Sequence, residues 1–266
     1  MTAEIVDRVL ESPRYRDVDR SLLSRLAAEE LPRARSNDDA VKRVKRRLHQ
    51  AVGAFRGERR TDALGPIRRA WNGDMTDPAF RDACAKVLRT HASTRERLPH
   101  QAAFYVGIWQ HTGVPRRLLD IGCGLNPLAL PWMDIGDASY RATDVDRRPL
   151  DTVRGFLELI GQPGEVRATD AVVDPPTDEA DVALLLKLVT TLDRQHASAA
   201  SRLLEALRVR HAVVSFPART LGGRGKGMER TYRERLERLV ADCPRVTGVA
   251  EASVANELVF VLTLDG

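Results

Sequence analysis

The stretch 116–132, with the sequence RRLLDIGCGLNPLALPW, constrains the fold of this chain more than any other. An apolar run ends in Asp120, Gly122 and Gly124 follow, and a second apolar segment begins after Pro127. Apolar runs bounded by glycine are typical of a buried strand that turns into a helix. Glycine permits a tight turn and a close approach by a ligand because it lacks Cβ, and proline suits the first helical turn. The stretch therefore predicts a strand, a glycine turn and a helix start.

Strands and helices are expected to alternate after residue 113, which indicates a mostly parallel sheet covered on both faces. The parallel strands are expected at 117–121, 139–143, 165–168, 181–188 and 211–216. The last two strands, expected at 246–252 and 257–264, would form an antiparallel pair at the edge, and long helices are expected at 148–160 and 194–208. The predicted fold is a doubly wound α/β domain.

Residues 1–112 are expected to be all-helical, with helices over 76–98 and 101–111 among others. Residues 1–110 hold 22 lysines and arginines against 15 aspartates and glutamates, so the excess positive charge lies here. A helix from Asn37 or Asp38 to residue 55 has one apolar stripe, and its other faces are basic. Such a face is usually only solvated. Eight basic residues against Glu58 between 41 and 60 nevertheless favour phosphate binding.

Candidate binding residues lie at the expected strand ends. In an open α/β sheet, ligands bind beyond the carboxyl ends of the strands, which here carry Gly122, Gly124, Asp144, Asp170 and Lys187. Asp144 follows Gly122 by 22 residues, near the separation at which an acid accepts hydrogen bonds from ribose hydroxyls. Asp170 is placed to accept from an adenine amino group. Isolated aspartates usually form turns or caps, but two beside a glycine turn favour an adenosine site.

Other signatures depart from their patterns. A dinucleotide fingerprint needs a third glycine where Pro127 stands. DPPT at 174–177 follows the third expected strand rather than the fourth and lacks the aromatic residue that amino-methylating enzymes use. LGGRGKGM at 221–228 departs from a phosphate-binding loop at both ends. The three cysteines form no C-x-x-C pair and the histidines show no ligand spacing, so we expect no metal site and no disulfide.

The glycine-rich stretch after residue 216 carries Arg219, Arg224 and Lys226. It can be a simple connection. Alternatively, it is a basic loop at the carboxyl edge of the sheet that closes on a negatively charged substrate.

Six stretches of the chain resemble the 16S ribosomal RNA (guanine-N7)-methyltransferases that confer aminoglycoside resistance. They are residues 41–55, 91–99, 118–133, 140–146, 183–195 and 213–228. The resemblance implies a Rossmann-like domain at 113–266 that binds S-adenosyl-L-methionine (SAM) and releases S-adenosyl-L-homocysteine (SAH). It also implies a helical domain at 1–112 that docks on the 30S subunit, and methylation at N7 of guanine 1405. One departure is LVTT at 188–191, where the family typically has a proline.

The resemblance also implies roles for individual residues. Arg97 would hold the SAM carboxylate, Gly122 and Gly124 its methionine part, Asp144 its ribose and Asp170 its adenine, while Lys187 and Leu188 line the pocket. A flipped guanine would be held by Arg224 and Met228. Further RNA contacts are expected from Arg219, Lys226, Lys42, Arg43, Lys45, Arg46 and Arg47. No catalytic base is expected, because guanine N7 offers a lone pair and carries no proton.

Several alternatives remain open at this point. A nicotinamide-dependent oxidoreductase uses a similar turn, a SAM-dependent methyltransferase can act on another RNA site or a small molecule, and a non-catalytic module can bind RNA alone. Residues 1–10 contain Glu4 and Asp7 and no apolar signal segment, and no run reaches membrane-spanning length, so we expect no export and no membrane anchor. The three widely spaced cysteines favour a reducing cytoplasm. We also expect a monomer.

Overall fold

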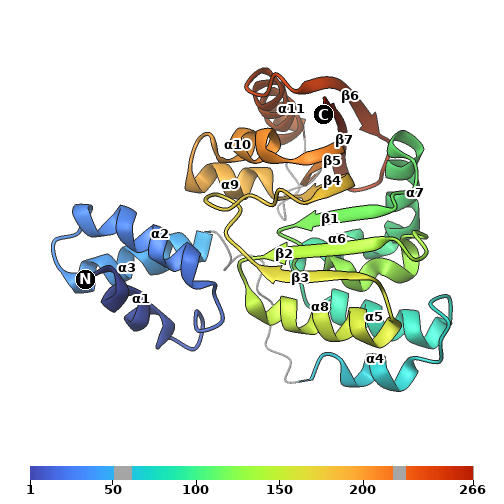
Figure 1. Ribbon diagram of the computed structural model, residues 1–266, viewed down its shortest axis with the longest axis horizontal. Coiled ribbons are helices and arrows are strands. Elements are labelled where there is room, and N and C mark those ends of the chain that lie inside the picture. The colour runs from blue at the N-terminus through green and yellow to red at the C-terminus, as the bar shows by residue number, and fades with distance from the viewer. Residues whose placement is uncertain (51–61, 218–225, 266) are drawn as a thin grey trace.

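The computed structural model describes residues 1–50, 62–217 and 226–265, with side chains from residue 228 onward in the last stretch. Figure 1 shows a small helical bundle at one end of the long axis, beside a larger α/β unit. Within the described ranges, no helix combines the length and apolar character that crossing a bilayer requires.

The α/β unit is built on a sheet of seven strands among the described residues, in the order β3-β2-β1-β4-β5-β7-β6. The first five strands pair in parallel, whereas β7 runs antiparallel to both β5 and β6. The predicted doubly wound sheet with an antiparallel edge is therefore confirmed. The strands are β1 (Arg117–Ile121), β2 (Ser139–Asp144), β3 (Gly164–Ala168), β4 (Glu179–Leu186), β5 (Arg208–Pro217), β6 (Val246–Ala252) and β7 (Glu257–Leu264).

Alternate residues of each strand point to opposite faces of the sheet, as the pleat requires. In β1, Leu118 joins one apolar cluster, and Leu119 and Ile121 join the other. The first face is covered by α4 (Gly65–Ala70), α5 (Pro78–Leu88), α7 (Gln101–Thr112), η4 (Asn126–Trp132) and α8 (Arg147–Ile160). The second face is covered by α9 (Val189–Gln195), α10 (Ala199–Ala206) and α11 (Lys226–Ala241).

Two predicted long helices are each divided in the structure. The helix predicted at 194–208 is wrong in extent, because His196 adopts an extended backbone between α9 and α10. The helix predicted at 76–98 is interrupted between α5 and α6 (Ala92–Arg97), where His91 is also extended. The helix start predicted after Pro127 is the 3-10 helix η4, which contains Pro131.

The N-terminal bundle consists of α1 (Thr2–Leu10), α2 (Arg20–Glu30) and α3 (Asn37–Leu48), with the short turn η1 (Leu31–Arg33). Its buried side chains, from Ile5 to Leu48, form a hydrophobic cluster of their own. Helix α3 is capped by Ser36, whose hydroxyl accepts from the backbone N–H of Asp39. The predicted caps, Asn37 and Asp38, lie instead inside its first turn. There the negative charge of Asp38 interacts favourably with the positive end of the helix dipole.

The division between the hydrophobic clusters falls between α3 and α4. Helices α4, α5 and α7 lie within the predicted helical domain 1–112, yet their buried residues belong to the same cluster as one face of the sheet. The predicted boundary at 112 therefore does not coincide with a change of core.

Backbone hydrogen bonds join the bundle to the sheet unit. The N–H of Asp19 donates to the carbonyl of Val145 at 2.8 Å, and that of Arg147 donates to the carbonyl of Asp17 at 2.9 Å. This short antiparallel bridge pairs Val18 with Asp146, immediately after β2. The bundle is thus attached beside the carboxyl end of the sheet.

All three cysteines are buried thiols. Burial raises the pKa of Cys84 to about 12 and that of Cys243 to about 11, and it raises the pKa of Cys123 as well. The thiolate form is therefore scarce at neutral pH.

Candidate functional site

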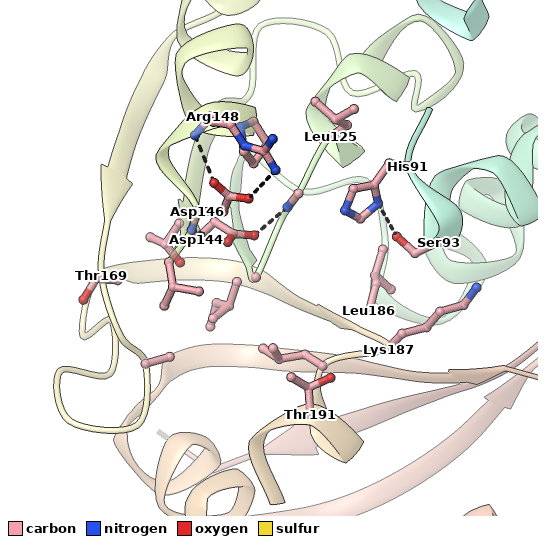
Figure 2. A pocket seen from close by; sticks show the side chains of 18 of the residues that line it. His91, Ser93, Leu125, Asp144, Asp146, Arg148, Thr169, Leu186, Lys187 and Thr191 are labelled. Carbon is pink, nitrogen blue, oxygen red and sulfur yellow. Dashed lines mark hydrogen bonds and ion pairs between the residues drawn. The ribbon is translucent and has the colours of Figure 1, made fainter. Parts of the chain in front are cut away.

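A cavity of about 210 Å³ lies at the carboxyl ends of β1, β2 and β4. Figure 2 shows side chains from both sides of the sheet edge converging on it. Six residues singled out in the sequence line it: Gly122, Gly124, Asp144, Asp170, Lys187 and Leu188. The fold therefore brings together the residues expected at separate strand ends.

The glycine turn after β1 leaves room for the cavity. Gly122 and Gly124 have φ angles of +65° and +51°, a region that side chains with Cβ rarely adopt. A Cβ on Gly122 would lie 2.8 Å from Leu188 Cδ1, and one on Gly124 would lie 3.0 Å from His91 Cε1. A side chain at Gly122 would therefore displace a residue of the cavity wall.

Asp144 links the end of β2 to this turn. Its Oδ2 accepts from the Gly124 N–H at 2.8 Å, and its Oδ1 accepts from the Asp146 N–H at 2.8 Å. Each carboxylate oxygen can accept a second hydrogen bond, so acceptor capacity remains for a ligand. Burial raises the pKa of Asp144 to about 6, despite these backbone donors.

Two further polar residues line the cavity. The hydroxyl of Thr143 is buried and has no hydrogen-bond partner among the described residues. An orphaned buried hydroxyl costs free energy, so it is a ready contact for a polar ligand. The second residue is His91, whose Nδ1 forms a hydrogen bond of 3.0 Å with the hydroxyl of Ser93. Burial lowers the pKa of His91 to about 4, so its ring is neutral at physiological pH. The sequence reasoning did not single out either residue.

Asp170 is 2% exposed and follows β3. Its Oδ1 accepts from the Val172 N–H at 3.1 Å, and its Oδ2 accepts from Nε of Arg25 at 2.7 Å. Arg25 lies on α2 of the N-terminal bundle. Sequence reasoning missed this contact, because 145 positions separate the partners and nothing in the pattern of α2 marks Arg25.

Arg97 occupies a buried ionic network next to the cavity and is absent from the described lining. It is 3% exposed, and its Nε and Nη2 donate to the two carboxylate oxygens of Glu257 at 3.0 and 3.2 Å. Its Nη1 donates to Asn126 Oδ1 at 2.8 Å. The predicted contact between Arg97 and a ligand carboxylate thus stays a prediction, and this structure pairs Arg97 with a protein carboxylate.

Lys187 belongs to both the cavity and this network. Its Nζ lies 3.2 Å from Glu257 Oε1 and 2.5 Å from Glu96 Oε2. Its φ angle is +57°, and its backbone N–H donates to the Ser215 carbonyl at 3.1 Å. This left-handed residue ends β4 at Leu186, two residues before the predicted strand end, and turns the chain toward α9.

Comparison with known proteins agrees with this geometry. The family model described as ribosomal RNA methyltransferase (FmrO) matches residues 11–261. The chain belongs to the FmrO ribosomal RNA methyltransferase family. A relative from Frankia casuarinae, named 16S rRNA (guanine(1405)-N(7))-methyltransferase, is 38% identical and covers 97% of this chain and 94% of its own. A relative of the same name from Micromonospora echinospora is 35% identical, covering 97% and 95%.

A solved structure is similar over nearly the whole length. The 16S rRNA methyltransferase RmtF in complex with S-adenosyl-L-homocysteine has a TM-score of 0.83 and 34% identity. The match covers 99% of this chain and 98% of RmtF, so the likeness includes the N-terminal bundle.

In this FmrO family member, the residues predicted to contact RNA on α3 differ in their surroundings. Lys42 and Arg46 are exposed and Lys45 is half-buried. Arg43 pairs with Asp39 and Glu30, and Arg47 pairs with Glu29 and Glu30. Arg43 and Arg47 are thus partly engaged within the bundle, while Lys42 and Arg46 face solvent.

The remaining predicted RNA contacts follow β5. Arg219 and Arg224 lie outside the described residues, and Lys226 is described only as the first backbone position of α11. Met228 is half-buried in the first turn of α11. Across the described ranges, no group of three or more histidine, cysteine or acidic side chains is arranged to hold a metal ion.

Proposed function

We propose that this protein transfers a methyl group from SAM to N7 of guanine 1405 in 16S rRNA of the 30S subunit. The observation that carries the proposal is the cavity at Gly122, Gly124 and Asp144, in a chain whose relatives are named for this reaction. RmtF, its structural neighbour, is in complex with the product S-adenosyl-L-homocysteine. We place its action in the cytoplasm, as a monomer.

The residues of the cavity fit an adenosyl ligand. Asp144 retains acceptor capacity for the ribose hydroxyls, and the unpartnered hydroxyl of Thr143 adds a polar contact within the same wall. Under the proposal, Asp170 in the cavity wall accepts from the adenine amino group, and the methionine part lies against the glycine turn. The predicted roles of Arg97, Lys187 and Leu188 at the methionine end belong to the same proposal.

The chemistry needs orientation more than proton transfer. SAM supplies an electrophilic methyl group on a sulfonium, and guanine N7 has a lone pair and no proton to lose. The protein therefore binds, aligns and shields the reacting groups, which is sufficient to lower the barrier substantially. A target base must first leave its stack to enter such a site. Under the proposal, Arg224 and Met228 hold that flipped base.

The positive charge of the N-terminal part suits docking on rRNA. Exposed Lys42 and Arg46 on α3 can contact phosphates, with Lys45, Arg43, Arg47, Arg219 and Lys226 as further proposed contacts. Methylation at N7 places a positive charge on the base and removes a hydrogen-bond acceptor. A polycationic aminoglycoside then loses a contact and meets repulsion, so the modification confers resistance.

The direct test is methylation of isolated 30S subunits. The protein is incubated with subunits and labelled SAM, and the modified base is mapped by chemical cleavage at N7-methylguanine. We expect one cleavage, at guanine 1405, together with kanamycin and gentamicin resistance in cells that express the protein. Label at another nucleotide, or none with folded protein that binds SAM, contradicts the proposal.

The raised pKa of Asp144 predicts that SAH affinity depends on pH. Asp144 protonates as the pH falls through about 6, and the protonated carboxyl has less acceptor capacity for ribose. We expect SAH affinity to fall by up to about tenfold per unit below pH 6 and to level off above pH 7. Calorimetry between pH 5 and 7.5 measures this.

Two variants test whether Asp144 causes this pH dependence of SAH affinity. Asp144→Asn should give weak and pH-independent SAH binding. Asp120 also has a pKa raised to about 6 by burial, but it accepts from Tyr140 and Asn126 and does not line the described cavity. Asp120→Asn should therefore keep the slope, and loss of the slope there assigns it to the wrong carboxyl.

Arg224→Ala should reduce methylation of the target without reducing cofactor affinity. Arg224 is assigned to the flipped guanine, so the variant should lose about tenfold or more in 30S methylation, the order of one lost charge-assisted contact. Its SAH affinity should stay within twofold of the wild-type value, about the error of calorimetry. An equal fall in both quantities places Arg224 in the cofactor pocket instead.

A further inference from the structure

A side chain from the N-terminal bundle reaches the wall of the cavity. Arg25 leaves α2 with a side chain only 9% exposed, and its Nε donates to Oδ2 of the buried Asp170 at 2.7 Å. Asp170 is itself a lining residue, so the bundle contributes one of the hydrogen bonds that hold this wall.

The same guanidinium holds a second lining residue. Arg25 Nη2 donates to Gln195 Oε1 at 2.5 Å, and Gln195 is the last residue of α9 and also lines the cavity. A planar guanidinium presents its donors in a fixed geometry. Asp170 and Gln195 are therefore held in a fixed relation by one side chain.

Arg25 is anchored by Glu29, and Arg47 holds two of the partners of Arg25. Nη1 of Arg25 donates to Glu29 at 3.2 Å, one helical turn further along α2. Arg47 of α3 donates from Nη2 to the backbone carbonyl of Gln195 at 3.0 Å and also pairs with Glu29. The contact between α2 and the wall thus belongs to a small network rather than to a single mobile arginine.

The hydrogen bonds of Asp170 leave it able to bind a ligand. One oxygen accepts from Val172 and the other from Arg25, while an ionised carboxylate offers about four acceptor sites. The orientation of the remaining sites is set by Arg25, because a carboxylate free to rotate would spread them over many directions.

We infer that Arg25 is a positioning residue of the cofactor site, which aims Asp170 at the adenine amino group from outside the cofactor-binding domain. The inference rests on the proposed function. It assigns the N-terminal bundle a second role: besides meeting RNA, the bundle completes the adenine end of the cavity. Cofactor affinity and selectivity therefore depend on α2, a helix of a bundle that has its own hydrophobic core.

The test compares SAH with its 6-deamino analogue, in which hydrogen replaces the adenine amino group. Calorimetry on the full-length protein gives the ratio of the two affinities. Wild-type protein should prefer SAH by about tenfold, the order of one hydrogen bond to a charged group. Arg25→Met should weaken SAH binding by about tenfold and bring the ratio close to one, and Arg25→Lys should restore part of it.

The matched control is Arg147→Met. Arg147 forms another ion pair across the junction between bundle and sheet, with Asp19 at 2.9 Å, and it does not line the described cavity. This variant should keep the wild-type ratio, because it weakens the junction without touching Asp170. A general loosening of the bundle would instead move both variants alike, which overturns the inference.

Other outcomes are equally decisive. If Arg25→Met folds poorly, the ratio in Arg25→Lys decides, and a ratio equal to wild type with unchanged SAH affinity overturns the inference. In an Asp170→Asn background, adding Arg25→Met should lower SAH affinity less than about twofold if Arg25 acts through Asp170. If wild-type protein fails to bind SAH at all, the proposed function itself is wrong. If wild-type protein binds SAH and the Arg25 variants keep its affinity and its ratio, only the inference is wrong.

Discussion

Replacing Glu257 by alanine should destabilise the protein by about 3–5 kcal/mol, the usual cost of removing one partner from a buried ion pair. Glu257 is 4% exposed and accepts two of the hydrogen bonds that the Arg97 guanidinium donates, and Lys187 Nζ lies 3.2 Å from its Oε1. The alanine leaves two buried cations with fewer partners. Urea denaturation of wild type and variant measures the difference in the free energy of unfolding.

The matched control lies on the neighbouring strand. Glu251 in β6 pairs with Arg233 at 2.7 Å, but both side chains are about two-fifths exposed. Exposed ion pairs contribute about 1 kcal/mol or less, so Glu251→Ala should have a small effect. Equal losses in the two variants would show that Glu257 does not hold the buried cations as the structure indicates.

Gly122→Val should weaken cofactor binding strongly. Its Cβ would lie 2.8 Å from Leu188 Cδ1 in the cavity wall, and φ is +65°, where a β-branched residue is strained. Overpacking of this kind costs about 1–3 kcal/mol, so we expect SAH affinity to fall about ten- to hundredfold. Calorimetry with SAH measures the change.

The Gly136→Val variant is the control for backbone strain alone. The φ of Gly136 is +55°, like that of Gly122, but a Cβ there would meet nothing within 4 Å. Gly136→Val should lower the melting temperature through strain and leave SAH affinity intact. Weak SAH binding in both variants would attribute the effect to stability rather than to the shape of the cavity.

Regular strands were predictable because their signal is local. The bounds of β1, β6 and β7 agree with prediction, since apolar runs between turn residues define them. The predicted end of β4 lies two residues beyond the observed one because Lys187 takes a left-handed backbone, which its residue type does not indicate. The break between α9 and α10 is likewise a matter of backbone geometry at His196.

The candidate site was predictable as far as strand ends and motifs reach. Asp144 and Gly124 are joined by a hydrogen bond because adjacent parallel strands end at the same edge of the sheet. The partner of Arg97 was not predictable, since Glu257 lies 160 positions away on the antiparallel strand β7. Arg25 was missed for the same reason: helix docking, not sequence spacing, brings it to Asp170.

The burial of Cys84, Cys123 and Cys243 has a practical consequence for spectroscopy. Maleimide dyes react with thiolates that solvent can reach, so the native thiols should stay unlabelled in folded protein. A cysteine introduced at exposed Glu11 and another at exposed Arg154 can then carry a donor and an acceptor fluorophore. Energy transfer between them would report how the bundle sits against the sheet when a ribosomal subunit is engaged.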